Sequence, residues 1–304
     1  MVFPGQGSQS VGMQADLAAE YAVVQETYAE ASEILGYDLW ALVQNGPTEK
    51  LSETVVTQPA MLAAGTAAYR VWLAAGGDAP AQVAGHSLGE YSALVAAESL
   101  SFADAMTVVI RRSKLMEEAV PVGVGAMAAI IGLDDNSVIE ACDESSSIGI
   151  AEPVNFNSPG QVVIAGHKSA VANAIRHCKA AGARRALLLP VSVPSHSSLM
   201  IAAGEALKEA LTAAKIANPT VKVLAATDGK AYSDPDDIRT RLSMQVYGPV
   251  HWVETTNALI DGGASSIIEC GPGKVLAGLC RRINKGTKVS FIDSNDSLQK
   301  ALLA

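Results

Sequence analysis

The sequence predicts an α/β protein in which a large domain with a parallel sheet carries an inserted small domain. Between residues 81 and 97, a short apolar strand runs through a tight turn directly into a helix, as in parallel sheets. Between residues 122 and 196, strands and helices follow one another in the ferredoxin-like order β-α-β-β-α-β. We therefore expect a large domain of residues 1–121 and 197–304 and a ferredoxin-like small domain of residues 122–196.

The elements of the large domain follow from apolar periodicity and from helix start signals. Ser101, with Asp104 three residues later, resembles a capping box, so a helix is expected to begin there. Apolar residues at helical spacing predict further helices over 11–35, 58–75 and 88–97, from 197 to about 217, and over 294–304, and short apolar runs predict strands over 81–84, 221–227 and 265–270.

The elements expected in the small domain are short, mostly about ten residues each, and follow one another as strand, helix, strand, strand, helix and strand. This spacing leaves room for two helices on one face of a four-stranded sheet. The expected strands cover 125–133, 147–156, 157–166 (with a turn at its start) and 183–191, and the expected helices cover 134–145 and 168–182.

Composition excludes several classes of protein. With 304 residues, 49% hydrophobic and 17% charged, the chain can bury a large core, and a net charge of −9 argues against a nucleic-acid partner. The apolar runs are too short to span a membrane, and no leader-like segment opens the chain, so we expect a cytoplasmic protein. The cysteines are scattered without metal-ligand spacing, so they predict reduced thiols and neither a metal nor another cofactor: Cys142, Cys178, Cys270 and Cys280.

A single serine stands out in the stretch VAGHSLGEYSA. Ser87 is flanked two positions away by Gly85 and Gly89, with an apolar strand before it and a helix after it. This G-x-S-x-G pattern is typical of a turn that exposes a nucleophilic serine beside the free N–H groups of a helix start. The alternative is a structural turn with an incidental serine, and the matching context on both sides favours the nucleophile.

His196 is the best candidate for the base that activates this serine. It lies in PVSVPSHSS, a loop between an apolar strand and a helix, where catalytic side chains are often placed. His86 is adjacent to the serine, and side chains of neighbouring residues in such a turn point apart. The remaining histidines read as a turn residue, a solvated helix residue and a residue beside Trp252, respectively: His167, His177 and His251.

No acid occupies the position that a serine hydrolase would need. In that class the acid lies between serine and histidine, in a loop at the end of a strand. The aspartates in that interval lie at helix starts or ends instead, namely Asp104, Asp134, Asp135 and Asp143. A backbone carbonyl could orient the histidine, which would leave a dyad rather than a triad.

Arg112 lies on the apolar face of a predicted helix, whereas Arg111 lies on the opposite, polar face. A buried guanidinium is costly unless it is paired, and no acid lies at a matching helical position. Either a distant carboxylate of the protein or a carboxylate of the substrate could be its partner. From the residues alone the protein partner is favoured, because buried structural ion pairs are commoner than ligand clamps.

Two glycine-rich turns do not fit nucleotide-binding patterns. FPGQGSQ lacks the third glycine of a dinucleotide fingerprint, because Ser10 stands there, and GPGKV lacks the spacing of a phosphate-binding loop. Both could be simple turns. In the first turn, however, the closely packed backbone could also bring the amide of Gln6 into a site.

Taken together, these stretches resemble one family, the malonyl-CoA:acyl carrier protein transacylases of bacterial fatty acid synthesis. The resemblance covers essentially the whole chain and implies an α/β-hydrolase-like large domain with a ferredoxin-like small one. It is carried by the interior Arg112 and by FPGQGSQ, GHSLGEYSA, NFNSPGQVVIAG, PVSVPSH, MQVYGPVHW and ECGPGKVL.

The resemblance implies a role for each matching position. Ser87 would be the nucleophile and His196 the base, with the main-chain carbonyl of Gln245 in place of the missing acid. Arg112 would hold the carboxylate of the malonyl group, which reverses the preference for a protein partner. The backbone N–H groups of two residues would form the oxyanion hole: Gln6 and Leu88.

The implied activity is transfer of malonyl from malonyl-CoA to the phosphopantetheine thiol of acyl carrier protein through a malonyl-serine ester. A serine thioesterase or hydrolase acting on acyl-CoA is the alternative, and a non-catalytic acyl-CoA-binding protein ranks third. We expect a monomer. The carrier protein is acidic in this family, so basic residues could dock it: Arg281, Arg282 and Lys285, with neighbouring Lys288, or else Arg184 and Arg185.

Overall fold

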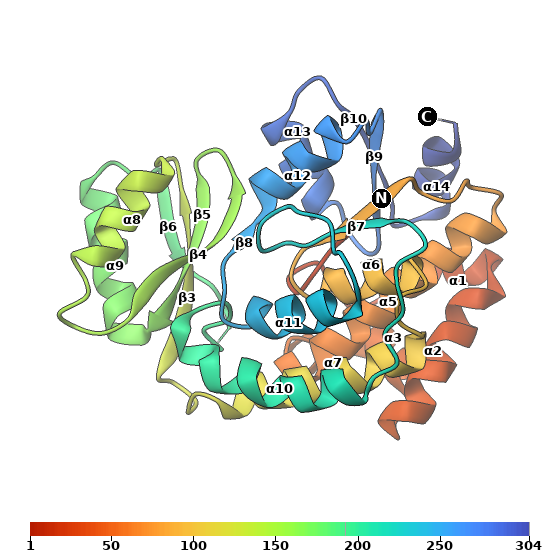
Figure 1. Ribbon diagram of the computed structural model, residues 1–304, viewed down its shortest axis with the longest axis horizontal. Coiled ribbons are helices and arrows are strands. Elements are labelled where there is room, and N and C mark those ends of the chain that lie inside the picture. The colour runs from red at the N-terminus through yellow and green to blue at the C-terminus, as the bar shows by residue number, and fades with distance from the viewer. Residues whose placement is uncertain (192, 304) are drawn as a thin grey trace.

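The computed structural model describes residues 1–191 and 193–303; Ser192, in the loop before His196, and Ala304, at the end of the last predicted helix, lie outside the described residues. The structure has two five-stranded sheets, each with its own helices. The smaller of these two units lies beside the larger one (Figure 1). The α/β fold class predicted from the sequence is confirmed. No helix in the described residues combines the length and apolar character needed to cross a membrane.

The sheet of the large unit is parallel throughout, in the order β10-β9-β1-β2-β7. The central strand is only two residues long, yet both are fully buried: Val2 faces the core beneath α12 and α13, and Phe3 faces the core of the opposite side. The strands are β1 (Val2–Phe3), β2 (Gln82–Gly85), β7 (Lys222–Leu224), β9 (Ser266–Cys270) and β10 (Lys288–Ile292). The edge strand β10 was not predicted.

Helices cover both faces of this sheet (Figure 1). The expected single helix over 11–35 is wrong, because Tyr21 has extended backbone angles (φ −121°, ψ 104°) and separates α1 from α2. The helices are α1 (Ala15–Glu20), α2 (Ala22–Leu35), α3 (Leu39–Asn45), α4 (Thr48–Leu51), α5 (Thr54–Ala74), α6 (Gly89–Ala96), α7 (Phe102–Glu118), α10 (Ile201–Ala213, after a 3-10 turn at Ser198–Met200), α11 (Pro235–Gln245), α12 (Trp252–Asp261), α13 (Val275–Ile283) and α14 (Asn295–Leu302).

The small sheet has the order β6-β3-β5-β4-β8. Its first four strands are antiparallel and ferredoxin-like, with two helices packed on the face away from the large unit (Figure 1). The fifth strand, β8, comes from outside residues 122–196 and runs parallel to β4. The elements are β3 (Gly125–Ile131), α8 (Asp135–Asp143), β4 (Ala151–Ser158), β5 (Gln161–His167), α9 (Lys168–Ala180), β6 (Arg185–Leu188) and β8 (Val250–His251).

Candidate active site

Ser87 sits at a sharp turn between β2 and α6, with a left-handed backbone (φ 52°). The flanking glycines are required by close packing. A Cβ at Gly85 would lie 1.9 Å from the carbonyl carbon of Gly89, and a Cβ at Gly89 would lie 2.0 Å from the backbone oxygen of Phe3. The turn can therefore form only where neither position carries a side chain, and the sequence interpretation of this stretch is supported by the packing.

His196 lies directly against this serine. Its Nε2 is 2.8 Å from Ser87 Oγ, and its Nδ1 is 2.7 Å from the backbone oxygen of Gln245, at the end of α11. The backbone N–H of His196 donates to the oxygen of Val246, which fixes the loop, and His196 itself has a left-handed φ of 68°. The structure thus brings together the serine, histidine and carbonyl named from the sequence, in the order of a dyad supported by the main chain.

The imidazole of His196 is held in its neutral form. Burial, and to a smaller extent the positive charge of Arg112, lowers its pKa from 6.5 to about 3. The carbonyl of Gln245 accepts the Nδ1 proton and so leaves Nε2 free to accept the proton of Ser87. A neutral histidine with this tautomer is the form that general-base catalysis requires.

The two residues whose backbone N–H groups are expected to form the oxyanion hole line the same cavity as Ser87. Gln6 lies in the turn after β1, and Leu88 precedes the first residue of α6. Across residues 1–191 and 193–303, neither N–H donates to another protein group. Unpaired donors at a helix start can stabilise an oxyanion, as predicted for these two positions.

Arg112 is a buried cation, with 1% of its surface exposed. One terminal nitrogen donates to Gln58 Oε1 at 2.6 Å, and the other donates to Gln245 Oε1 at 3.0 Å and to Ser87 Oγ at 3.3 Å. These partners are all neutral, and Nε has no partner among the described residues. The protein carboxylate favoured from the residues alone is therefore wrong, and burial lowers the pKa of Arg112 below its usual value.

The other histidines make structural contacts. His86 Nε2 lies 2.8 Å from Asn157 Oδ1 of β4, with its ring against Trp252. This contact ties the serine turn to the small sheet and supports the interpretation of His86 as structural. His167 accepts a hydrogen bond from Ile150 N–H, and His177 pairs with Glu144. His251 stacks on Phe156.

A cavity of about 470 Å³ joins these groups between the two sheets. The large unit contributes the serine turn, the glycine turn after β1 and residues of α5, α7 and α13. The small sheet contributes Met127, Asn155 and Gln161, and the loop before His196 closes the remaining side. The site can therefore hold an acyl group with a negative end, bound between Ser87 Oγ and a guanidinium that has no carboxylate partner among the described residues.

Comparisons with known proteins show the family to which the chain belongs. The profile of the acyl transferase domain family matches residues 1–289. The malonyl CoA-acyl carrier protein transacylase of Escherichia coli (strain K12) is 55% identical over 301 residues, which cover 99% of this chain and 97% of that protein. The chain belongs to the malonyl CoA-acyl carrier protein transacylase family. The relative from Bacillus subtilis (strain 168) is 40% identical over 99% of the chain and 95% of its own length.

Solved structures of the transacylase family have the same fold. The acyl carrier protein S-malonyltransferase of Vibrio cholerae is 52% identical, with a TM-score of 0.95 over 99% of this chain and 98% of that one. A malonyl-transacylase in complex with its type II PKS acyl-carrier protein is also 52% identical, with a TM-score of 0.98 over 100% of this chain and 98% of that one. The family resemblance predicted from the sequence is confirmed.

Some transacylase site residues escaped the sequence interpretation. Gln58 bonds to Arg112, and its signal was a buried amide in the otherwise apolar helix α5. The side chain of Gln245 contacts Arg112, while only its carbonyl was predicted. The amide of Asn157, which holds His86, lies in the quoted stretch NFNSPGQVVIAG without having been assigned a role.

The basic residues proposed for docking lie beside the cavity. Arg281, Arg282 and Lys285 are exposed at and after the end of α13, whose inner face lines the cavity with Leu276 and Leu279. Arg282 also donates to the side-chain oxygen of Gln161 at 2.6 Å. Because Gln161 lines the cavity, Arg282 adjoins its rim, whereas Arg281 donates to the backbone oxygen of Val289 in β10.

Proposed function

We propose that this protein transfers a malonyl group from malonyl-CoA to the phosphopantetheine thiol of acyl carrier protein, through an ester on Ser87. The observation that carries the proposal is Arg112, a buried guanidinium with only neutral partners that reaches the nucleophile's oxygen. The carboxylate of a malonyl group would pair with this guanidinium, whereas an acetyl group has no carboxylate and would leave it without a partner of opposite charge. The relatives described above, which are named for malonyl CoA and acyl carrier protein, support the same donor and acceptor.

The first half-reaction acylates the serine. His196 Nε2 takes the proton of Ser87 Oγ as that oxygen attacks the thioester carbonyl, and the resulting oxyanion faces the N–H groups of Gln6 and Leu88. When the tetrahedral intermediate collapses, the C–S bond breaks and the CoA sulfur takes the proton from His196. CoA thiol leaves, and the malonyl group remains on Ser87 with its carboxylate at Arg112.

The second half-reaction runs the same steps in reverse with a different thiol. His196 accepts the proton of the phosphopantetheine thiol, whose sulfur attacks the malonyl ester. The C–O bond to Ser87 then breaks, and Ser87 Oγ regains a proton from His196. In each half-reaction His196 takes up one proton and gives one back. The histidine therefore needs only to be held in the right tautomer, which the Gln245 carbonyl can do.

Three further assignments belong to this proposal. The basic residues Arg281, Arg282 and Lys285 would dock the acidic carrier at the cavity rim, as their place on α13 supports. The division into residues 1–121 with 197–304 and residues 122–196 is supported by separate hydrophobic cores, although β8 crosses it. A cytoplasmic location is supported by four free, buried cysteines, which suit a reducing compartment.

Product analysis separates transfer from the alternatives. Malonyl-CoA is incubated with the enzyme, with and without acyl carrier protein in its phosphopantetheine form, and malonyl-carrier and free malonate are quantified. We expect malonyl-carrier, with little malonate when the carrier is absent. Rapid release of malonate without carrier would indicate a hydrolase, and absence of any turnover would indicate a binding protein.

A further inference from the structure

The side chain of Gln245 lies in the middle of a series of buried hydrogen bonds that runs from Arg112 to Glu90 and Tyr232. Its oxygen accepts from Arg112, whereas its nitrogen donates to the backbone oxygen of Ser87 at 3.0 Å and to the carboxyl group of Glu90. An arginine can only donate, so the amide must present its oxygen toward Arg112. The group that accepts the hydrogen bond from the Gln245 nitrogen therefore helps to fix the position of the Arg112 guanidinium.

Glu90 is the group that holds this nitrogen. It is the second residue of α6 and is fully buried, and its two oxygens accept from Gln245 Nε2 and from the hydroxyl of Tyr232. Burial raises the pKa of Glu90 to about 7, and these hydrogen bonds oppose that rise. In the proposed reaction Glu90 touches neither the acyl group nor the dyad, so the reaction itself leaves this costly buried carboxyl unexplained.

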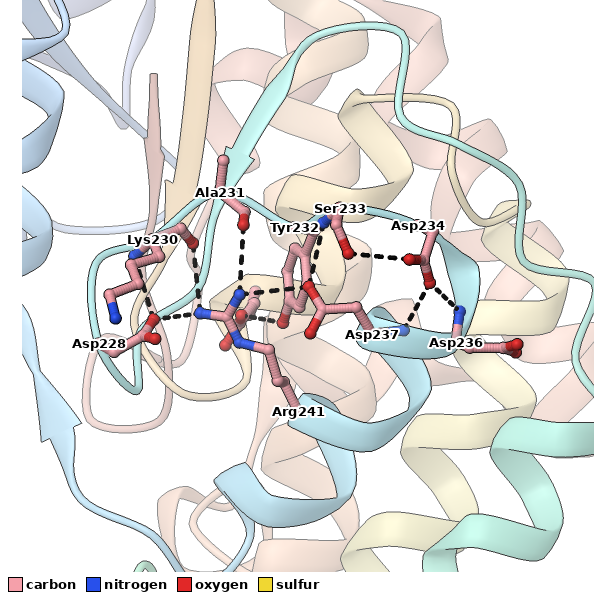
Figure 2. Close-up of polar contacts among 10 residues, drawn as sticks. Asp228, Lys230, Ala231, Tyr232, Ser233, Asp234, Asp236, Asp237 and Arg241 are labelled. Atoms are coloured by element: carbon pink, nitrogen blue, oxygen red, sulfur yellow. Dashed lines mark hydrogen bonds and ion pairs between the residues drawn. The ribbon is translucent and has the colours of Figure 1, made fainter.

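Tyr232 is fixed in turn by Arg241 of α11 (Figure 2). The Arg241 guanidinium lies 4.8 Å from the centre of the tyrosine ring and pairs with Asp228 and with Asp237. It also donates to the backbone oxygens of Lys230 and Ala231, which brace the loop before α11. Arg241 and Gln245 are four residues apart on α11, so one helix anchors both ends of the contact with Glu90.

We infer that Glu90 is a positioning residue for acyl selection, which holds the Gln245 amide with its oxygen toward Arg112. The carboxyl group lies one amide away from the guanidinium and does not contact it. A directly paired carboxylate would compete with the malonyl carboxylate, whereas a carboxylate one amide away leaves the guanidinium open to it. This inference rests on the proposed malonyl transfer.

The decisive variant is Glu90→Gln, which keeps the side-chain shape and removes the charge and one acceptor. The Gln245 amide then keeps the backbone oxygen of Ser87 as an acceptor but loses its charge-assisted hydrogen bond to the carboxyl group, so its oxygen is held less firmly against Arg112. We expect the ratio of kcat/KM for malonyl-CoA to that for acetyl-CoA, measured as acylation of Ser87, to fall about tenfold or more. Tyr232→Phe keeps the carboxyl group and removes one donor, so a smaller fall in the same ratio is expected.

Two comparisons separate positioning from a merely structural role. Glu269→Gln is the matched control, because Glu269 is also a fully buried carboxyl group but accepts from Leu276 N–H and Ala277 N–H instead. It should lower the melting temperature and leave the acyl ratio unchanged. In a Gln245→Met background, which keeps the backbone carbonyl, Glu90→Gln should change the ratio much less than in the wild type.

The outcomes distinguish this inference from the proposed function. If the wild-type protein takes neither acyl group on Ser87, the proposed function is overturned and the inference with it. If the wild type prefers malonyl and Glu90→Gln keeps that preference, or loses both activities equally, only the inference is overturned. A Glu90 effect of equal size in the Gln245→Met background would also contradict it, because the effect would not pass through the amide.

Discussion

At the scale of single residues, the feature of the site that points to a malonyl group is that Arg112 has no carboxylate partner in the part of the chain that the structure describes. A buried guanidinium bonded to two amide oxygens and a hydroxyl keeps its charge uncompensated by any direct partner among the described residues. Such a charge is retained at a cost that a carboxylated ligand can offset. Selectivity for a malonyl group would therefore come from one side chain, while Ser87 and His196 supply chemistry that any acyl group could use.

Arg112→Ala tests this division directly. We expect acylation by malonyl-CoA to fall by about 100-fold or more in kcat/KM, because the malonyl carboxylate loses the cation that pairs with it, while acylation by acetyl-CoA is spared or raised. Arg111→Ala is the matched control, since Arg111 is exposed on the other face of α7 and should leave both rates unchanged. Equal losses for both acyl groups in Arg112→Ala would contradict the assignment.

The lowered pKa of His196 predicts an unusual dependence on pH. Its usual pKa is 6.5 and its pKa here is about 3, so the folded protein keeps the base neutral while an unfolded chain takes up a proton below 6.5. The stability that this group contributes is present above pH 6.5 and is lost as the pH falls from there toward 3. The kcat/KM for acetylation of Ser87, which needs neither Arg112 nor the Glu90 carboxyl group, should accordingly show no acidic limb near 6.5, and a half-maximal rate at that pH would contradict the assignment.

Ser87 and His196, the side chains proposed to do the chemistry, were predictable from the residues, and so were the free N–H groups at the helix start, but the carbonyl proposed to orient His196 was not. Ser87 and His196 could be found from the glycine pattern and from a histidine in a loop after a strand. The Gln245 carbonyl has no signature in residue type, because every residue carries one, so only the family resemblance pointed to it. The role of its side chain depends on contacts with distant elements that no local pattern encodes.

At the scale of elements, the turn at Ser87 depends on packing between β1, β2 and α6. Gly89→Ala would place a Cβ 2.0 Å from the backbone oxygen of Phe3, which only movement of the sheet could relieve. We expect unfolding to become easier by about 1–3 kcal/mol or more, together with loss of acylation, measured by denaturant unfolding and adduct formation. Gly278→Ala in α13 is the control, because no heavy atom lies within 4 Å of its added Cβ. Its stability should be unchanged or slightly higher, and similar behaviour of both variants would refute the packing argument.

Several elements with a clear apolar pattern were predicted, but the amphipathic helices α12 and α13 were missed, and so were polar or interrupted elements. The strand before Ser87 and the alternation of the small domain gave the fold class. The helix α11, PDDIRTRLSMQ, has few apolar residues and is started by Asp234 as its cap, a signal that could have found it. The break at Tyr21 and the strand β8 depend on contacts across the molecule, so local periodicity did not reveal them.

At the scale of the whole molecule, basic residues at and after the end of α13 lie near the cavity through Arg282 and Gln161, on a protein of net charge −9. Replacing Arg281 and Arg282 together by Glu should raise the KM for acyl carrier protein by about tenfold at low salt, with acylation by malonyl-CoA unchanged. The control changes Arg184 and Arg185 in the same way, an equal change in charge at the far edge strand of the small sheet. Unchanged carrier kinetics in the first variant would rule out this docking surface, and an effect confined to the second would move docking to β6.

The covalent intermediate is the most direct test of the account. The protein is mixed with malonyl-CoA, its intact mass is measured, and acyl carrier protein in its phosphopantetheine form is then added. We predict one malonyl adduct per chain on Ser87, absent in Ser87→Ala and removed by the carrier as malonyl-carrier appears. An adduct that persists in Ser87→Ala, or one that the carrier does not discharge, would contradict transfer through this serine.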